Sequence, residues 1–211
     1  AVHVFVFLYV SNRHELSALY NRYGALPGDL RPHMWITHMF LHGGTDHLAG
    51  NMLFLALFGM NVERRLGAPL YLLLYVLSGL ASLGLFLFFQ SRADMPLVGA
   101  SGAISGISGM YLVLFARRLV EIFWFAIFWG GFVKAPAFLF TLLWVGVEAI
   151  QAIVMGKMVV VAHWAHVGGF VGGGVLLALA RLAGFRGHAE TYAAEAVLPE
   201  FKELEFLPEQ E

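Results

Sequence analysis

Cysteine is absent from this chain of 211 residues, and charged residues make up only 13% of it. The lack of cysteine excludes disulfides, cysteine nucleophiles and thiolate metal ligands, although it leaves the redox compartment open. Soluble domains usually carry about 25% charged residues, so this composition is too apolar to cover a water-exposed surface. The net charge is −1 and no basic block is present, which gives no reason to expect a nucleic-acid partner.

Hydrophobic residues are abundant instead: they form 59% of the chain, and the mean hydropathy is +0.74. They occur in long continuous runs, not in the alternating segments of about ten residues that are typical of membrane barrels. We therefore predict an all-α polytopic membrane protein that resides in the lipid bilayer.

The hydrophobic runs predict six transmembrane helices. The first run, Ala1–Val10, is too short to span, and we interpret it as the second half of a helix truncated at its start. Leu119–Val133 has fifteen residues, below the usual minimum of about 17, so we expect it to lie at the interface and not to cross. The other five spans are expected at His47–Val62, Ala68–Gln90, Leu97–Ala116, Pro136–Met155 and Ala162–Gly184.

The expected organisation is one membrane domain, residues 1–184, followed by an acidic cytoplasmic tail, residues 185–211. Within the domain, residues 1–11 form the partial first helix, residues 12–45 an amphipathic first loop, and residues 46–184 helices two to six. The side of the bundle that is richer in basic residues should be cytoplasmic, and we expect a bacterial cytoplasmic membrane. The basic residues on that side are Arg64, Arg65, Arg117, Arg118, Lys134, Arg181 and Arg186.

Three polar clusters lie inside predicted spans, where polar groups are costly and usually mark function. The first is His47 with Asn51, four residues apart on one helix face. The second is Gly99–Gly106, which contains Ser101, and the third is Ala162–Gly169, which contains His166. With six spans, helices two, four and six run in the same direction, and each cluster lies in the first turns of its helix. The clusters should therefore meet at one depth toward the outer side, unless the interfacial run crosses the bilayer.

These residue types suit nucleophilic catalysis. A serine hydroxyl becomes a good nucleophile when a neighbouring base takes its proton, and a neutral imidazole can be that base. Small-residue faces at Gly102–Gly106 and Gly169–Gly173 would allow the two helices to pack closely. His47, Asn51 and the Ser101 amide could donate hydrogen bonds to an oxyanion. No aspartate within a span is placed to orient His166, so we expect a Ser-His dyad.

The motifs resemble those of the rhomboid family of intramembrane serine proteases. The family's G-x-S-G motif corresponds to Gly99–Gly102, H-x-x-x-N to His47–Asn51, and A-H-x-x-G to Ala165–Gly169. The order of the motifs and their places in helices two, four and six also agree with the family. One departure is Ser105, which stands four residues after the motif serine, where many members have an aromatic residue.

The resemblance implies a six-transmembrane-helix rhomboid-like bundle with Ser101 as nucleophile and His166 as general base. It also implies an oxyanion hole formed by His47, Asn51 and the Ser101 amide. The expected activity is a serine endopeptidase that cleaves transmembrane segments of other membrane proteins, without cofactor or metal. One alternative is an inactive rhomboid-like protein that binds membrane clients, which the presence of both Ser101 and His166 disfavours. Another is a metal-dependent membrane protein, suggested by nine histidines but lacking H-E-x-x-H.

Several polar residues have two interpretations. His163 could replace His166 as the base, but the glycines do not follow it at the family's spacing. His38 and His42 are four residues apart and could bind a metal, although packing and hydrogen bonding to loop backbone are favoured. Glu148 is expected to face a loop or polar crevice, and we assign it no role. No carboxylate within a span is expected beside a histidine pair.

Overall fold

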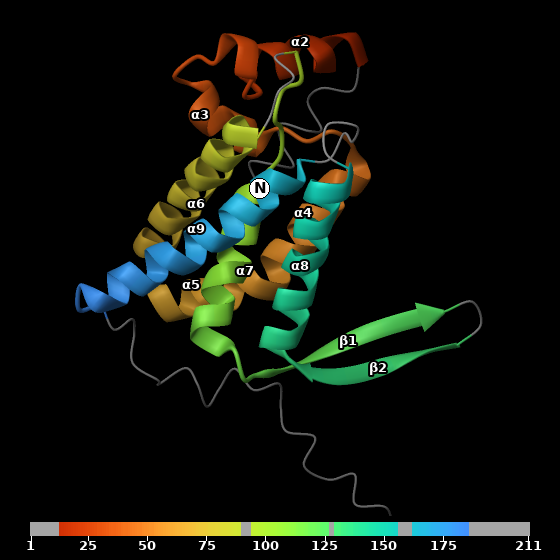
Figure 1. The fold of residues 1–211 in the computed structure, drawn as a ribbon, viewed down its shortest axis with the longest axis vertical. Helices are drawn as coiled ribbons and strands as arrows, with labels where there is room; N and C mark the ends of the chain where they lie inside the picture. The colour runs from red at the N-terminus through yellow and green to blue at the C-terminus, as the bar shows by residue number, and fades with distance from the viewer. Residues whose placement is uncertain (1–12, 90–93, 127–128, 156–161, 186–211) are drawn as a thin grey trace, which may run out of the picture.

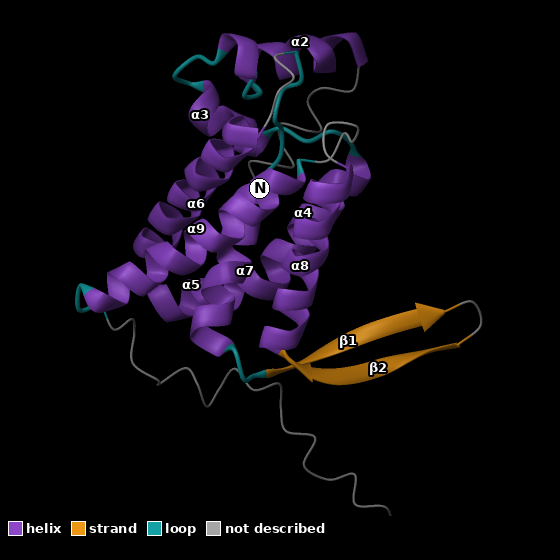
Figure 2. Cartoon of the chain, viewed as in Figure 1, coloured by secondary structure: helices purple, strands orange, loops and turns teal. Residues whose placement is uncertain are grey.

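The computed structural model describes residues 13–89, 94–126, 129–155 and 162–185, and these form a helical bundle with a β-hairpin at one end (Figures 1 and 2). Helix α2 lies across the opposite end of the bundle from the hairpin. The elements in chain order are α2 (Arg13–Tyr23), η1 (Pro27–Asp29), α3 (Met34–Thr37), η2 (His38–Phe40), α4 (Thr45–Phe54), η3 (Leu55–Gly59), α5 (Met60–Leu66), α6 (Ala68–Phe89), α7 (Ser101–Phe115), β1 (Leu119–Ala126), β2 (Trp129–Pro136), α8 (Ala137–Met155) and α9 (His163–Leu182).

Among the described residues, three helices are long and apolar enough to cross a membrane: α6, α9 and Ala137–Val154 of α8. The 22 residues of α6 measure about 33 Å at about 1.5 Å per residue, close to the thickness of the hydrocarbon core. The single π-helical turn η3 joins α4 and α5, so these three elements follow one another from Thr45 to Leu66. The predicted first helix falls outside the described residues.

Helix α7 is the central element of the bundle. It has 15 residues, and every residue from Gly102 to Tyr111 is buried. It begins later than the predicted span at Leu97, because Leu97 pairs with the backbone of Ala25 and Gly99 adopts a φ of +123°. A helix cannot continue through that φ, so the residues before Ser101 form an irregular segment.

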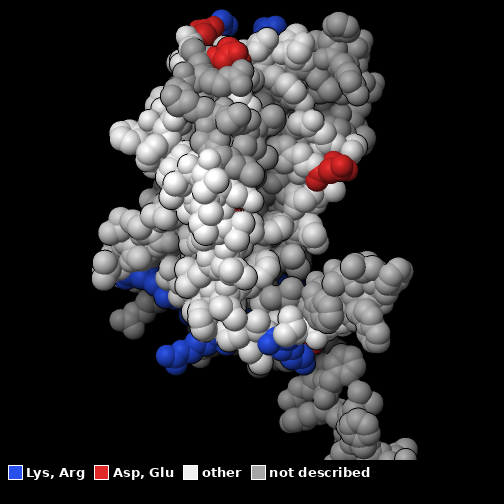
Figure 3. All heavy atoms as spheres, turned by 45° about the vertical axis from the view of Figure 1, so that its right-hand side comes forward, with Lys and Arg blue, Asp and Glu red and all other residues white. Residues whose placement is uncertain are grey.

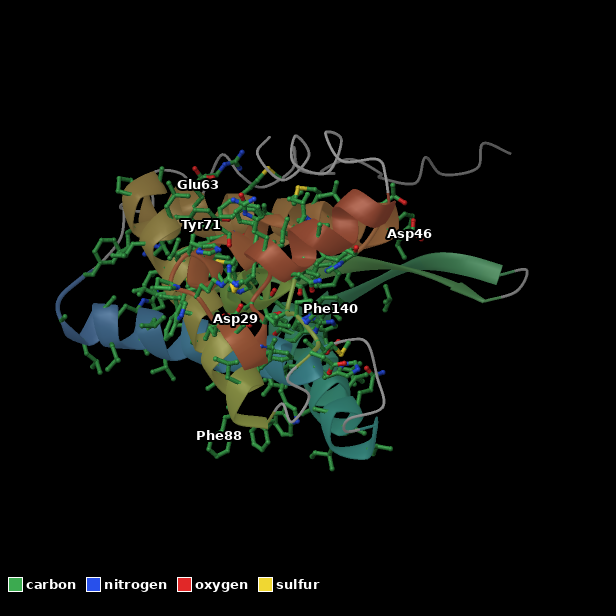
Figure 4. All side chains as sticks on the ribbon, turned by 90° about the horizontal axis from the view of Figure 1, so that it is seen from above. Asp29, Asp46, Glu63, Tyr71, Phe88 and Phe140 are labelled. Atoms are coloured by element: carbon green, nitrogen blue, oxygen red, sulfur yellow. The ribbon has the colours of Figure 1, made fainter. Side chains whose placement is uncertain are left out.

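The outer surface has the distribution expected of a membrane protein. Large apolar side chains are exposed on α6, α8 and α9, including Leu72, Leu143 and Leu179. Phe88 is 80% exposed and points away from the bundle (Figure 4). On the face in Figure 3, most charged side chains lie toward the two ends, with uncharged atoms between them. The protein is therefore an integral, multi-pass membrane protein, as its composition predicts.

Glycines allow α7 and α9 to pack backbone against backbone. A β-carbon added at Gly169 would overlap the carbonyl of Gly102, and one added at Gly173 would overlap the carbonyl of Gly106. The two helices are therefore closer than any residue with a side chain would permit at these positions. This close approach brings the first turn of α7 beside the first turn of α9.

We expect Gly173→Ala to lower the free energy of unfolding by about 1–3 kcal/mol, the usual range for overpacking a well-packed interior. Gly174→Ala is the matched control, because its added β-carbon would have no neighbour nearer than 3.6 Å, the oxygen of Gly109. Thermal unfolding of both variants in one detergent measures the difference. Equal midpoints for the two variants would contradict the packing described here.

The predicted interfacial run forms part of a β-hairpin, which its hydropathy alone did not indicate. β1 and β2 pair antiparallel, with Glu121 opposite Lys134 and their charged groups 3.2 Å apart. Strand β1 reads Leu-Val-Glu-Ile-Phe-Trp-Phe-Ala, rich in the β-branched and aromatic residues that favour strands. Because the hairpin leaves and rejoins the bundle at the same end, α7 and α8 are antiparallel (Figure 1). Gly102 and Gly106 of α7 lie against Gly169 and Gly173 of α9 in the same order, so these two helices are parallel. In the second predicted span, His47 lies against Gly99 and Phe58 against Tyr111, so the predicted common direction of helices two, four and six is correct.

Candidate active site

The first loop holds Ser101 in place through the segment that precedes it. Ala25 and Leu97 exchange two backbone hydrogen bonds of 2.9 Å, and the N–H of Gly99 donates to the carbonyl of His38 at 2.9 Å. Ser101 is the first residue of α7 and is half-buried. Ala25, which follows α2, and His38 of η2 are thus bonded directly to the segment before α7.

Gly99 is required at its position for two reasons. Its φ of +123° is strained for residues with a side chain. A β-carbon there would also lie 2.8 Å from Cε1 and Nε2 of His47 and 3.6 Å from Oγ of Ser101. The imidazole of His47 therefore lies against the backbone just before Ser101.

Ser101 and His166 are in hydrogen-bond contact across the α7–α9 interface. Oγ of Ser101 is 2.9 Å from Nε2 of His166, although 65 residues separate them in the sequence. The imidazole is 13% exposed. The structure thus brings together the two residues predicted as nucleophile and base, and places His163 against Glu148 instead.

Glu148 on α8 is the residue that sequence reasoning missed. Its Oε2 lies 2.7 Å from Nδ1 of His166 and 2.8 Å from Nδ1 of His163. The prediction that no carboxylate within a span lies beside a histidine pair is therefore wrong. The available signal was its charge: it is the only acidic residue within Pro136–Met155, and charged residues inside spans usually have a function.

His47 and Asn51 lie on α4, four residues apart. Nδ1 of His47 accepts a hydrogen bond of 3.2 Å from the N–H of Gly43, so a neutral imidazole carries its proton on Nε2. This is the nitrogen that lies near Gly99. Asn51 is 6% exposed, and its Nδ2 has no hydrogen-bond partner among the residues that the structure describes. Each side chain therefore has an N–H group available to an oxygen atom of a substrate.

The two loop histidines take part in packing. His38 is buried, and its Nδ1 donates to the carbonyl of Met34 at 2.8 Å, as the favoured interpretation predicted. Burial lowers the pKa of His38, an effect that the hydrogen bond to Met34 opposes. The ring of His42 packs edge-on against that of His47, with the centroids 5.3 Å apart.

An aromatic neighbour of His166 comes from α8. The ring centroids of Trp144 and His166 are 6.1 Å apart, with an interplanar angle of 32°. Ser105, at the position where many family members have an aromatic residue, instead donates from Oγ to the carbonyl of Ser101 at 2.7 Å. The imidazole therefore contacts an aromatic ring that the motif spacing did not predict.

The fold and this cluster describe a multi-pass membrane protein with a serine–histidine pair at the start of two adjacent helices. The sequence model of the Rhomboid domain family matches residues 30–183. The chain therefore belongs to the rhomboid family, as its three motifs predicted.

Curated relatives agree with this assignment. The chain is 41% identical over 87 residues to the Bacillus subtilis protein named "Putative rhomboid protease YdcA", covering 40% of this chain and 43% of that protein. It is 36% identical over 140 residues to Arabidopsis thaliana RHOMBOID-like protein 4, covering 65% of this chain and 31% of the relative. It is 34% identical over 109 residues to Saccharomyces cerevisiae Rhomboid protein 1, mitochondrial, covering 50% of this chain and 31% of that relative. The matches span less than half of the length of each relative.

Proposed function

We propose that this protein is an intramembrane serine endopeptidase, with Ser101 as nucleophile and His166 as general base. The hydrogen-bond contact of 2.9 Å between Ser101 Oγ and His166 Nε2 is the observation that carries the proposal. A nucleophile and base within hydrogen-bond reach, with the base held by a third group, are the usual signature of this chemistry. The B. subtilis relative's name, which includes the words rhomboid protease, agrees with it.

The reaction needs two proton transfers through His166 in acylation and two more in deacylation. Ser101 gives its hydroxyl proton to His166 Nε2 while Oγ bonds to the scissile carbonyl carbon and the carbonyl π electrons move to oxygen. His166 then gives the proton to the peptide nitrogen as the C–N bond breaks, which leaves an ester on Ser101. Water attacks this ester and gives its proton to His166, and the Ser101 oxygen departs and recovers that proton.

The proposed oxyanion hole consists of His47, Asn51 and the backbone N–H of Ser101. The Nε2–H of His47 and the Nδ2 of Asn51 come from one face of α4, and the Ser101 amide is at the start of α7. A helix N-terminus also favours negative charge because its first N–H groups lack partners within the helix. These donors would stabilise the oxygen anion of each tetrahedral intermediate.

The proposed substrates are transmembrane segments of other proteins. A peptide carbonyl inside a helix is hydrogen-bonded to its own backbone, so an enzyme can reach it only where the helix opens. Glycine and proline weaken helices and would supply such places. We propose a bacterial cytoplasmic membrane, with the active site toward its outer side, because the arginines at the ends of α5, α7 and α9 lie on the other side.

A metal-dependent hydrolase is the second candidate. One ligand atom each from Glu148, His163 and His166 lies within 4.8 Å of the others, and nitrogen and carboxylate oxygen are common zinc ligands. Cleavage would then be sensitive to a chelator and would not require the Ser101 hydroxyl.

Cleavage of a fluorescent transmembrane substrate in proteoliposomes, with and without a chelator, separates the candidates. A serine protease would cleave at the same rate with the chelator, and Ser101→Ala would not cleave. Loss of cleavage on chelation would favour the metal-dependent reaction. A folded wild-type protein that binds the substrate without cleaving it would instead favour an inactive client-binding protein.

A further inference from the structure

One oxygen atom of Glu148 contacts two histidines. Oε2 lies 2.7 Å from Nδ1 of His166 and 2.8 Å from Nδ1 of His163, and the Glu148 side chain is 13% exposed. Glu148 comes from α8, whereas both histidines lie in the first turn of α9. The carboxylate is therefore shared across a helix–helix interface next to the proposed nucleophile and base.

The two contacts limit where the protons can be. A protonated carboxyl carries one hydrogen, so its oxygen could donate to only one histidine, and the other would have to donate to it. An ionised carboxylate carries none and accepts from both Nδ1–H groups. The ionised form makes both hydrogen bonds charge-assisted, and such bonds are about twice as strong as neutral ones. Both contacts at Oε2 are therefore best satisfied when each histidine carries its proton on Nδ1.

We propose that Glu148 is a positioning residue that holds His166 in the Nδ1–H tautomer, so that the Nε2 lone pair faces the Ser101 hydroxyl. This inference rests on the proposed protease function. Two hydrogen-bond contacts connect the three side chains. Oε2 of Glu148 contacts Nδ1 of His166, and Nε2 of the same imidazole lies 2.9 Å from Oγ of Ser101. In the opposite tautomer Nε2 would carry a hydrogen and could not accept the proton of Ser101.

Glu148 also stabilises His166 after the imidazole has accepted the proton of Ser101. When His166 accepts the Ser101 proton at Nε2, the imidazole becomes a cation and keeps its Nδ1 proton. A carboxylate that is already in contact with Nδ1 then balances that charge inside the bundle, where an uncompensated charge is costly. The Nδ1–H of His163 donates a second hydrogen bond, which keeps the carboxylate oxygen of Glu148 in place during this proton transfer.

The same three side chains could bind a metal ion, but the two arrangements require opposite tautomers. A metal bound at both Nδ1 atoms needs their lone pairs, so both protons would have to lie on Nε2. The positioning role needs both protons on Nδ1. The location of the His166 proton in the wild-type protein therefore decides between them.

The first test locates that proton by ¹⁵N NMR of histidine-labelled wild-type protein in detergent, both without and with a chelator, with His166→Gln used to assign the signal. We expect protonated Nδ1 and unprotonated Nε2 in the neutral ring. Protonation of Nε2 instead would overturn the proposal. The measurement needs no substitution at Glu148, so it remains informative even if variants at that position do not fold.

The second test compares Glu148→Leu with Glu148→Gln in the cleavage assay. Leucine is similar in size and suits the apolar bundle, but it accepts no hydrogen bond, so kcat should fall roughly 10²-fold or more with KM within two-fold. Glutamine keeps one oxygen acceptor and should recover part of the lost kcat. Gln151→Leu, on the same helix, is the matched control and should keep the wild-type kcat.

The results separate this inference from the protease function itself. If wild-type protein cleaves and Glu148→Leu cleaves within two-fold of it, the positioning role is overturned while the protease function stands. If correctly folded wild-type protein does not cleave, the proposed function fails. A raised KM with unchanged kcat in Glu148→Leu would also overturn the positioning role, because it would indicate substrate binding instead.

Discussion

Replacement of His166 by alanine is expected to lower kcat for transmembrane-substrate cleavage by roughly 10⁴- to 10⁶-fold, the range found when one member of a serine-protease catalytic unit is removed. Nε2 of His166 is the group in contact with Oγ of Ser101, so without it the hydroxyl has no base at 2.9 Å. Ser101→Ala should lose a similar amount, and the double variant should lose no more than either single variant, because the two residues act as one unit.

His163→Ala is the matched control for this prediction. His163 lies three residues before His166 on α9 and contacts the same oxygen of Glu148, at 2.8 Å. We expect a loss of less than ten-fold, because the His166–Glu148 contact of 2.7 Å remains. A larger loss in His163→Ala than in His166→Ala would identify His163 as the base and contradict the assignment.

The second large effect is expected at the oxyanion hole. Asn51→Ala should lower kcat by roughly 10²- to 10³-fold with little change in KM, which corresponds to about 2.7–4 kcal/mol of transition-state stabilisation. Nδ2 of Asn51 is buried and lacks a partner among the described residues, so it is available to an oxygen that carries charge only during the reaction. His47→Ala should have an effect of similar size.

Asn61→Ala is the matched control for Asn51→Ala. Asn61 lies further along the same helical segment, on α5, and its Nδ2 donates to the carbonyl of Leu57 at 3.4 Å. Its replacement should leave kcat within two-fold of wild type. If Asn51→Ala raised KM and left kcat unchanged, Asn51 would bind the ground state of the substrate and would not be an oxyanion donor.

Much of the helical bundle could be predicted from the sequence because hydrophobic length is a strong signal in membranes. The predicted span Ala68–Gln90 corresponds to α6 at Ala68–Phe89, and Gly67 just before it has the positive φ, +79°, of a helix-terminating glycine. The convergence of Ser101 and His166 followed from helix direction alone. The boundaries at residues 1–11 and 185–211 stay predictions, because nearly all of those residues lie outside the part that the structure describes.

The features that were missed depend on information that hydropathy does not contain. Leu119–Val133 is apolar enough for a short helix, and its pairing with residues up to Pro136 decides that it belongs to a hairpin. The partners of Glu148 depend on the rotation of α8 about its axis, and a single long apolar segment does not specify that rotation. The ring of Trp144 reaches His166 for the same reason.

The most direct test of the central claim is to map the site of fluorophosphonate modification by mass spectrometry. Purified wild-type protein, treated in detergent with a chelator present, should carry one adduct, on the peptide that contains Ser101. His166→Ala should remain unmodified under the same conditions. An adduct on another serine, or modification of His166→Ala at the wild-type rate, would contradict the proposal that His166 activates Ser101.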